Sequence, residues 1–176
     1  DEQMRLLSNL ILFLGRDRIP QPRFWYFPKD VKAVLVMATD DHGTEDGTPR
    51  SFEHMLAADA PGCVVEQWEC ARATSWTFLP TKLTNKQALA LHKQGFDIGS
   101  HASTYCQNWS AESLARTFAT DLESFRVAFP DLAPQETSRL HCIVWSTYLT
   151  QPKIGRGWGL RFDMNYYYWP KDWIRG

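Results

Sequence analysis

An apolar segment that ends in two carboxylates is the strongest constraint on the fold of this chain. Residues 31–38 read VKAVLVMA, and Asp40, Asp41, His42 and Gly43 follow almost at once. Adjacent carboxylates raise one another's pKa unless a cation or a shared proton lies between them. The pattern therefore indicates a metal or shared-proton site at the end of a buried strand. The alternative is an ordinary turn, because Asp, His and Gly are common turn residues.

Two later segments repeat this arrangement. His101 follows the short strand-like run 96–100, and Arg139 opens another run that extends to Ser146. Sites at the carboxyl ends of successive parallel strands are typical of α/β barrels and doubly wound sheets. The sequence therefore predicts an α/β protein.

The hydrophobic periodicity predicts alternating strands and helices. Thr84 and Gln87 have the spacing of a capping box, and Ser110 is placed to cap a longer helix with one apolar stripe. The order of strand and then helix favours parallel pairing. The predicted helices are 4–14, 51–58, 84–94, 110–129 and 147–153, and the predicted strands are 32–39, 75–79, 96–100, 139–146 and 160–168.

The composition excludes several classes of protein. A chain of 176 residues with 44% hydrophobic and 22% charged content is expected to form a single domain over residues 1–176. The formal net charge of -1 and the lack of a basic block argue against a nucleic-acid partner. The apolar stretch 10–14 is too short to cross a bilayer, so no membrane span is expected. The oligomeric state is not indicated.

The cysteines do not form a zinc-binding pattern. The 4 cysteines, at positions 63, 70, 106 and 142, fit no CxxC spacing. Cys106 comes shortly after His101 and Cys142 shortly after Arg139, so these two approach disulfide distance if their segments are neighbours in a sheet. The alternative is that all the cysteines are free and buried.

Four short motifs occur in the order found in the polysaccharide deacetylases, carbohydrate esterase family 4. They are TDDHG at 39–43, IGSH at 98–101, RLH at 139–141 and GLRFD at 159–163, and TFLPT at 77–81 resembles that family's second strand. The likeness spans roughly residues 32–165, about three quarters of the chain. The chain therefore resembles this family over most of its length.

The resemblance implies a distorted (β/α) barrel, expected to be incomplete in this chain, and a metal-dependent hydrolase that removes N-acetyl groups from a carbohydrate or polysaccharide. It makes Asp40 the general base and Asp41 and His101 ligands of a divalent metal, with zinc expected. It makes Arg139 the residue that orients the base and Asp163 the residue that tunes the acid. These residue types suit the chemistry, because a zinc-class ion activates water and a neighbouring carboxylate takes its proton. The family also implies a secreted or cell-envelope location.

The chain departs from the family pattern at two places. Tyr105 stands where the family has its second ligand His, and a phenol is a poor zinc ligand at neutral pH. Either His42 or water is then expected to complete the site. No His follows His141, so the family's late general acid is expected to lie beyond a truncation. His141 shares a predicted strand face with Arg139 and has either a site role or a packing role.

The many aromatic residues near the C-terminus leave a further alternative open. Trp145 and Tyr167 are candidates for stacking against a sugar ring, although strand aromatics more often pack in a core. Two other functions remain consistent with the sequence. One is a catalytically inactive carbohydrate-binding relative of the same fold, and the other is a hydrolase of a different non-peptide C–N bond.

Overall fold

The computed structural model describes residues 2–15 and 35–165. The chain divides into two compact units, Asp1–Val36 and Met37–Gly176. The first contains α1 (Glu2–Gly15), which confirms the helix predicted over 4–14 and has no buried residue. Among the described residues, no helix combines the length and the hydrophobicity that crossing a membrane requires.

Two small parallel sheets form the centre of the second unit. The first joins β1 (Met37–Asp41), β2 (Ala73–Thr77) and β3 (Asp97–Ser100) in that order. Asp41 aligns with Thr77, and Thr77 aligns with Ser100, so the three strands end at the same edge. The second sheet joins β4 (Thr137–Ser138) to β5 (Phe162–Asp163), also in parallel. The predicted parallel pairing is confirmed. The described strands do not close into a barrel, and the barrel stays a prediction.

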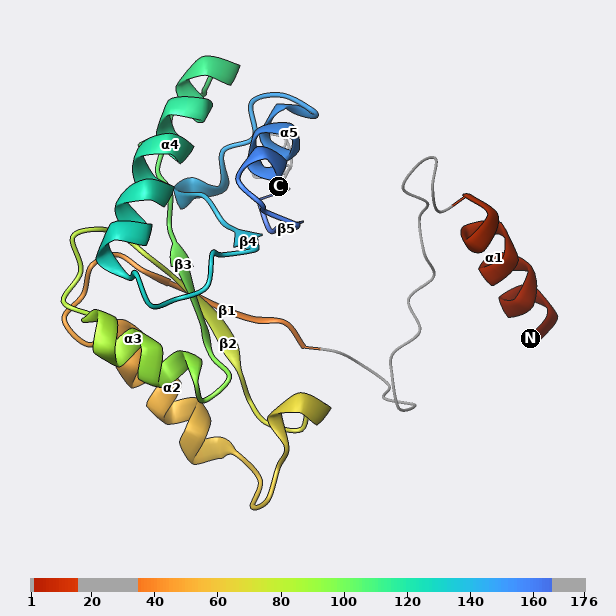
Figure 1. The fold of residues 1–176 in the computed structure, drawn as a ribbon, viewed down its shortest axis with the longest axis horizontal. Coiled ribbons are helices and arrows are strands. Elements are labelled where there is room, and N and C mark those ends of the chain that lie inside the picture. Colours follow the sequence, from red (N-terminus) through yellow and green to blue (C-terminus); the bar gives the residue numbers. More distant parts are fainter. Residues whose placement is uncertain (1, 16–34, 166–176) are drawn as a thin grey trace, which may run out of the picture. The chain divides into compact units, whose positions relative to one another are not determined.

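Helices follow the strands in the predicted alternation. They are α2 (Gly47–Ala58), α3 (Asn85–His92), α4 (Ala111–Ala128) and α5 (Thr150–Gly157), and Figure 1 shows α4 and α5 side by side. The capping box predicted at Thr84 is present, because its side chain accepts from the backbone of Gln87 and the Gln87 side chain accepts in return. Ser110 caps α4 in the same reciprocal way with Ser113. These caps satisfy backbone donors that a helix start otherwise leaves unpaired.

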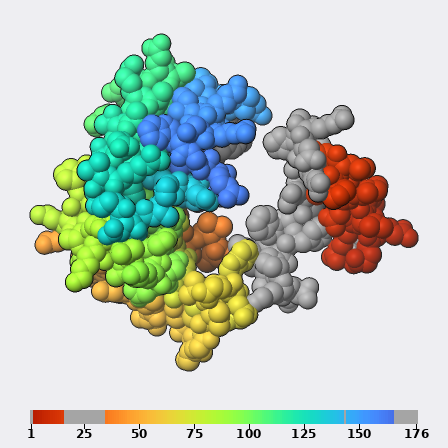
Figure 2. Space-filling model, viewed as in Figure 1, coloured from red at the N-terminus to blue at the C-terminus, as the bar shows by residue number. Residues whose placement is uncertain are grey.

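The predicted apolar stripe of α4 is buried in two hydrophobic clusters. Phe125 and Phe129 pack with the α2 and α3 side chains, where the rings of Phe52 and Phe96 stack at a centroid distance of 4.1 Å. Three earlier residues of the stripe, Leu114, Phe118 and Leu122, pack in the second cluster with Trp109 and Leu140. Burying a side chain of this size stabilises the fold by about 1.5–3 kcal/mol. The atoms of α4 and α5 meet on the face drawn in Figure 2.

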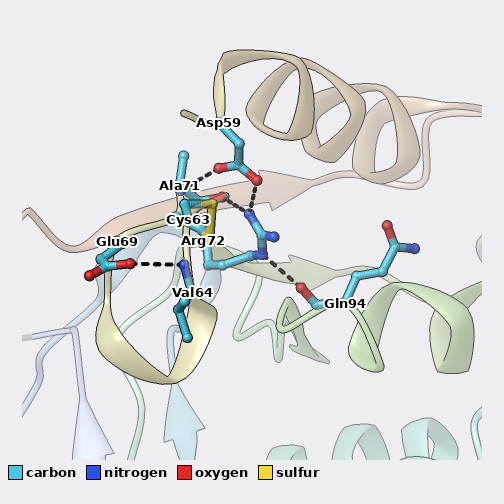
Figure 3. A network of polar contacts seen from close by, with 8 residues as sticks. Asp59, Cys63, Val64, Glu69, Ala71, Arg72 and Gln94 are labelled. Carbon is cyan, nitrogen blue, oxygen red and sulfur yellow. Dashed lines mark hydrogen bonds and ion pairs between the residues drawn. A yellow bond between two sulfur atoms is a disulfide. The ribbon is translucent and has the colours of Figure 1, made fainter. Parts of the chain in front are cut away.

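A polar network fixes the segment between α2 and β2. Arg72 donates from Nη1 to Oδ2 of Asp59 at 2.7 Å and from Nε to the carbonyl oxygen of Gln94 at 2.7 Å (Figure 3). A disulfide between Cys63 and Cys70, a pair that the sequence did not indicate, closes the intervening loop. The network thereby ties the end of α2 and the end of α3 to the start of β2.

The strand predicted over 139–146 is wrong. Pairing ends after Ser138, and the 3-10 helix η3 (His141–Ile143) follows, with Cys142 in the left-handed region at φ 63. The backbone N–H of His141 donates instead to the carbonyl oxygen of Ala102 at 2.9 Å. This contact joins the segment to the loop after β3, and a continuing strand ladder cannot form.

Candidate metal centre

Three histidines from separate loops converge beyond the carboxyl ends of the strands. His42 follows β1, His101 follows β3 and His141 begins η3. One ring nitrogen of each lies within 4.8 Å of the other two. The ring centroids are 5.4 Å apart for His42 and His101, 4.9 Å for His42 and His141, and 5.3 Å for His101 and His141. We call these three residues the histidine cluster.

The hydrogen bonding of His101 leaves one of its ring nitrogens available as a ligand atom. Its side chain is buried, and Nδ1 lies 3.1 Å from the carbonyl oxygen of Arg139. A carbonyl oxygen only accepts, so Nδ1 carries the ring proton and Nε2 keeps its lone pair. Nε2 is buried and has no hydrogen-bond partner among the described residues. A buried nitrogen without a partner is costly, and a metal ion would satisfy it.

Phe78 packs against all three imidazole rings. Its ring centroid lies 5.1 Å from that of His42, 4.9 Å from that of His101 and 5.0 Å from that of His141. Phe78 comes directly after β2, and its backbone N–H donates to the carbonyl oxygen of Asp41 at 2.9 Å. The phenyl ring therefore limits the orientations that the histidines can adopt.

Burial keeps two of the cluster histidines neutral. It lowers the pKa of His101 to about 4, although the negative charge of Asp40 opposes the fall. Burial also lowers the pKa of His141, an effect strengthened by His42 and opposed by Asp40. Only a neutral imidazole has a lone pair for a metal, so both side chains are in the ligand form at neutral pH.

The predicted base and its orienting arginine are in contact. Nε of Arg139 lies 2.9 Å from Oδ1 and 3.0 Å from Oδ2 of Asp40. Both side chains are about one quarter exposed, at 26% and 28%. These two contacts of Nε fix the direction of the Asp40 carboxylate. The charge of Asp40 also acts on His101 and His141, so the pair belongs to the same site as the histidine cluster.

Asp41 is hydrogen-bonded to the loop that leads into α2 and to the first turn of that helix. Its carboxylate accepts from the backbone N–H of Thr44 at 3.0 Å and that of Thr48 at 2.9 Å, and from their hydroxyl groups at 2.9 and 2.7 Å. Burial would raise the pKa of Asp41, but these hydrogen bonds outweigh it and lower the pKa. The carboxylate is therefore held as a local structural acceptor. Its role as a metal ligand stays a prediction.

The other residues that the sequence suggested for the site are Asp163, Trp145 and Tyr167. Asp163 aligns with Ser138 in the second sheet, and its carboxylate accepts from Nε2 of the buried Gln151 at 3.0 Å. Trp145 is half-buried in the segment after η3, while Tyr167 lies outside the described residues. The roles of Asp163, Trp145 and Tyr167 stay predictions. Tyr105 is 83% exposed and is not part of the histidine cluster.

A disulfide joins the two loops that carry His101 and His141. Cys106 and Cys142 are bonded, which confirms the pairing that their positions predicted. The link connects the loop after β3 to η3, across a sequence separation of 36 residues. It therefore restrains the distance between two members of the histidine cluster.

The sequence did not predict that these three histidines form one group. It indicated His42 as one way to complete the metal site and His141 as either a site residue or a packing residue. The spacing of His141 two residues after Arg139 carried the signal, but a strand was expected where η3 forms. No family model matches the chain, and neither curated proteins nor solved structures give a significant match.

Proposed function

We propose that the chain is a metal-dependent hydrolase that removes N-acetyl groups from a carbohydrate, with zinc held by His42, His101 and His141. The observation that carries the proposal is the convergence of these three imidazoles beside the Asp40–Arg139 pair. Three protein ligands with one open position are typical of catalytic zinc sites. The buried, unpartnered Nε2 of His101 fits such an ion.

The chemistry divides between the ion and the side chains. When bound, zinc polarises the amide carbonyl and lowers the pKa of water to about 7. Asp40 would accept a proton from the attacking water, since a carboxylate within hydrogen-bond reach is an effective general base, and it would pass that proton to the amine nitrogen as the C–N bond breaks. Arg139 directs that carboxylate through its side chain. The carbonyl oxygen of the same residue holds the His101 ring, so one residue positions both the base and a ligand.

The ligand set proposed here differs from the one that the family resemblance implies. That resemblance makes Asp41 a ligand beside His101, whereas the proposal uses His42 and His141. The hydrogen bonds that Asp41 accepts from Thr44 and Thr48 favour the histidine set, because they already occupy both carboxylate oxygens.

Calorimetry with zinc tests the proposal. The metal-stripped chain is expected to bind one zinc ion, and His42→Ala and His141→Ala are each expected to weaken binding at least about tenfold. His54→Ala is the matched control, because His54 is exposed on α2. Acetate release from an N-acetylglucosamine oligomer then tests the activity. A folded wild type that binds no zinc would overturn the proposal.

A second function, carbohydrate binding without catalysis, is favoured by one observation. Tyr105 occupies the position of the family's second ligand, and its side chain is 83% exposed and lies outside the histidine cluster. Under this alternative, the chain binds the oligomer but releases no acetate with zinc present. The same two measurements therefore distinguish the two functions.

A further inference from the structure

A cavity lies next to the histidine cluster. It has a volume of about 580 Å³, and its lining includes His101, His141 and the ring of Phe78. Cavities of about 300–1,000 Å³ are the usual size for small-ligand sites. Two of the proposed zinc ligands therefore form part of the wall of a space large enough for a substrate group.

A second part of the lining comes from α4 and the loop after β3. It contributes the carboxylate of Asp121 and the hydroxyl groups of Ser103 and Ser124, and the exposed ring of Tyr105 lies at the loop. The lining thus combines hydroxyl groups, one carboxylate and aromatic rings. This mixture suits a ligand that has both hydroxyl groups and apolar C–H faces.

Two polar groups in this lining have unused hydrogen-bonding capacity. Asp121 accepts from the backbone N–H of Ser103 through Oδ2 at 2.9 Å, which leaves Oδ1 with no hydrogen bond from the described residues. Burial raises the pKa of Asp121, and the bond from Ser103 opposes the rise. Thr77 is 1% exposed, and its hydroxyl has no partner in the described part of the chain. The Thr77 hydroxyl is a buried polar atom of the kind that a partner usually satisfies, and here that partner would come from a ligand. Asp121 is half-buried, so its Oδ1 remains accessible to the same ligand.

We propose that this cavity binds one sugar ring of the carbohydrate substrate, with Asp121 accepting hydrogen bonds from its hydroxyl groups. The proposal rests on the proposed function for its substrate class. A carboxylate accepts but does not donate, so it selects hydroxyl donors and disfavours an anionic ligand. The sugar ring would then lie beside His101 and His141, where its N-acetyl group can reach the histidine cluster.

A binding measurement tests the role of Asp121. The probe is the β-1,4-linked tetramer of N-acetylglucosamine, titrated into the full chain and followed by calorimetry. All proteins carry Asp40→Asn, so that the acetyl groups remain in place during the titration. Asp121→Asn is compared with Glu123→Gln, a control on the same helix whose carboxylate is exposed and pairs with Arg126.

The affinity for the tetramer is expected to fall about tenfold in Asp121→Asn, since a hydrogen bond to a charged acceptor is stronger than one to an amide oxygen. It is expected to stay unchanged in Glu123→Gln. Asn keeps an oxygen for the N–H of Ser103, so a purely structural role would leave the affinity unchanged. Equal affinities for the two variants, or no binding by the folded Asp40→Asn chain, would overturn the proposal.

The two proposals fail in different ways. Zinc binding with acetate release, together with a tetramer affinity that does not depend on Asp121, would leave the hydrolase standing and remove the cavity as its sugar site. Tetramer binding that depends on Asp121, in a chain that binds no zinc, would keep the cavity and overturn the hydrolase.

Discussion

Arg139 holds Asp40 through its side chain, with Nε 2.9 Å from Oδ1 and 3.0 Å from Oδ2, although the two residues are 99 positions apart. The carbonyl oxygen of Arg139 lies 3.1 Å from Nδ1 of His101. The backbone of Arg139 therefore positions a proposed metal ligand while its side chain positions the proposed base. These two roles can be separated by substitution, because a side-chain variant keeps the carbonyl.

Replacing Arg139 by Ala is expected to lower kcat for acetate release at least about tenfold, because Asp40 loses the group that directs it. Zinc affinity is expected to stay unchanged, since the carbonyl still accepts from His101. Partly exposed ion pairs stabilise a fold by about 0–1 kcal/mol, so urea unfolding should change little. Arg50→Ala is the control, at an exposed arginine. An unchanged kcat in Arg139→Ala would contradict the role given to this side chain.

Replacing Asp41 by Asn is expected to lower the free energy of unfolding by at least about 2 kcal/mol, because one oxygen that accepts from a backbone N–H and a hydroxyl is lost. The pKa of Asp41 is lower in the folded chain than in the unfolded chain. Its ionised carboxylate therefore stabilises the fold at any pH above the unfolded pKa, and this stabilisation is lost as the pH falls through the folded pKa. Urea unfolding at neutral and at acid pH measures both effects. The control is Asp46→Asn, because the side chain of Asp46 makes no capping bond to α2. Equal stability of the two variants at neutral pH would count against this account of Asp41.

The metal-free chain is expected to lose stability as the pH falls from about 6.5 to about 4, by up to about 3 kcal/mol from His101 alone. Burial lowers the pKa of His101 to about 4, so in this window the unfolded chain binds a proton that the folded chain does not. His101→Gln should flatten the dependence of unfolding free energy on pH, whereas His54→Gln should not. The same slope in both variants would show that His101 does not titrate in this way.

Removing the Cys106–Cys142 disulfide is expected to weaken zinc binding, because the loops that carry His101 and His141 are no longer joined. The double variant Cys106→Ser, Cys142→Ser should also lose about 4 kcal/mol of stability, from a loop of 36 residues. The control is the double variant Cys63→Ser, Cys70→Ser, which removes a disulfide with a sequence separation of 7. It should lose about 2 kcal/mol of stability and keep its zinc affinity. Zinc calorimetry and urea unfolding on both variants give the comparison. Equal zinc affinities in the two double variants would show that the link does not support the site.

Local patterns in the sequence predicted much of the fold. The capping box at Thr84 and the apolar stripe of α4 were readable because they depend on residues close in the chain. Parallel pairing followed from the order of strands and helices. The strand expected after Arg139 failed, because the bond from His141 to Ala102 depends on a distant loop that periodicity does not report.

Only part of the candidate site could be predicted from the sequence. The Asp40–Arg139 contact agrees with the interpretation of the motifs, and the Cys106–Cys142 bond agrees with the prediction from the positions of these cysteines. The histidine cluster required η3 to turn His141 toward His42, and the four hydrogen bonds to Asp41 required the loop before α2 to fold back. Both depend on loop conformations, which the periodicity of a single sequence does not encode.

The most direct test of the central claim is X-ray absorption at the zinc edge of the zinc-loaded chain. Three imidazole nitrogens are expected at about 2.0–2.1 Å from the ion, and one of them should be lost in His42→Ala and in His141→Ala. A first shell that contains a carboxylate oxygen and is lost in Asp41→Asn, but not in His42→Ala or His141→Ala, would contradict this claim.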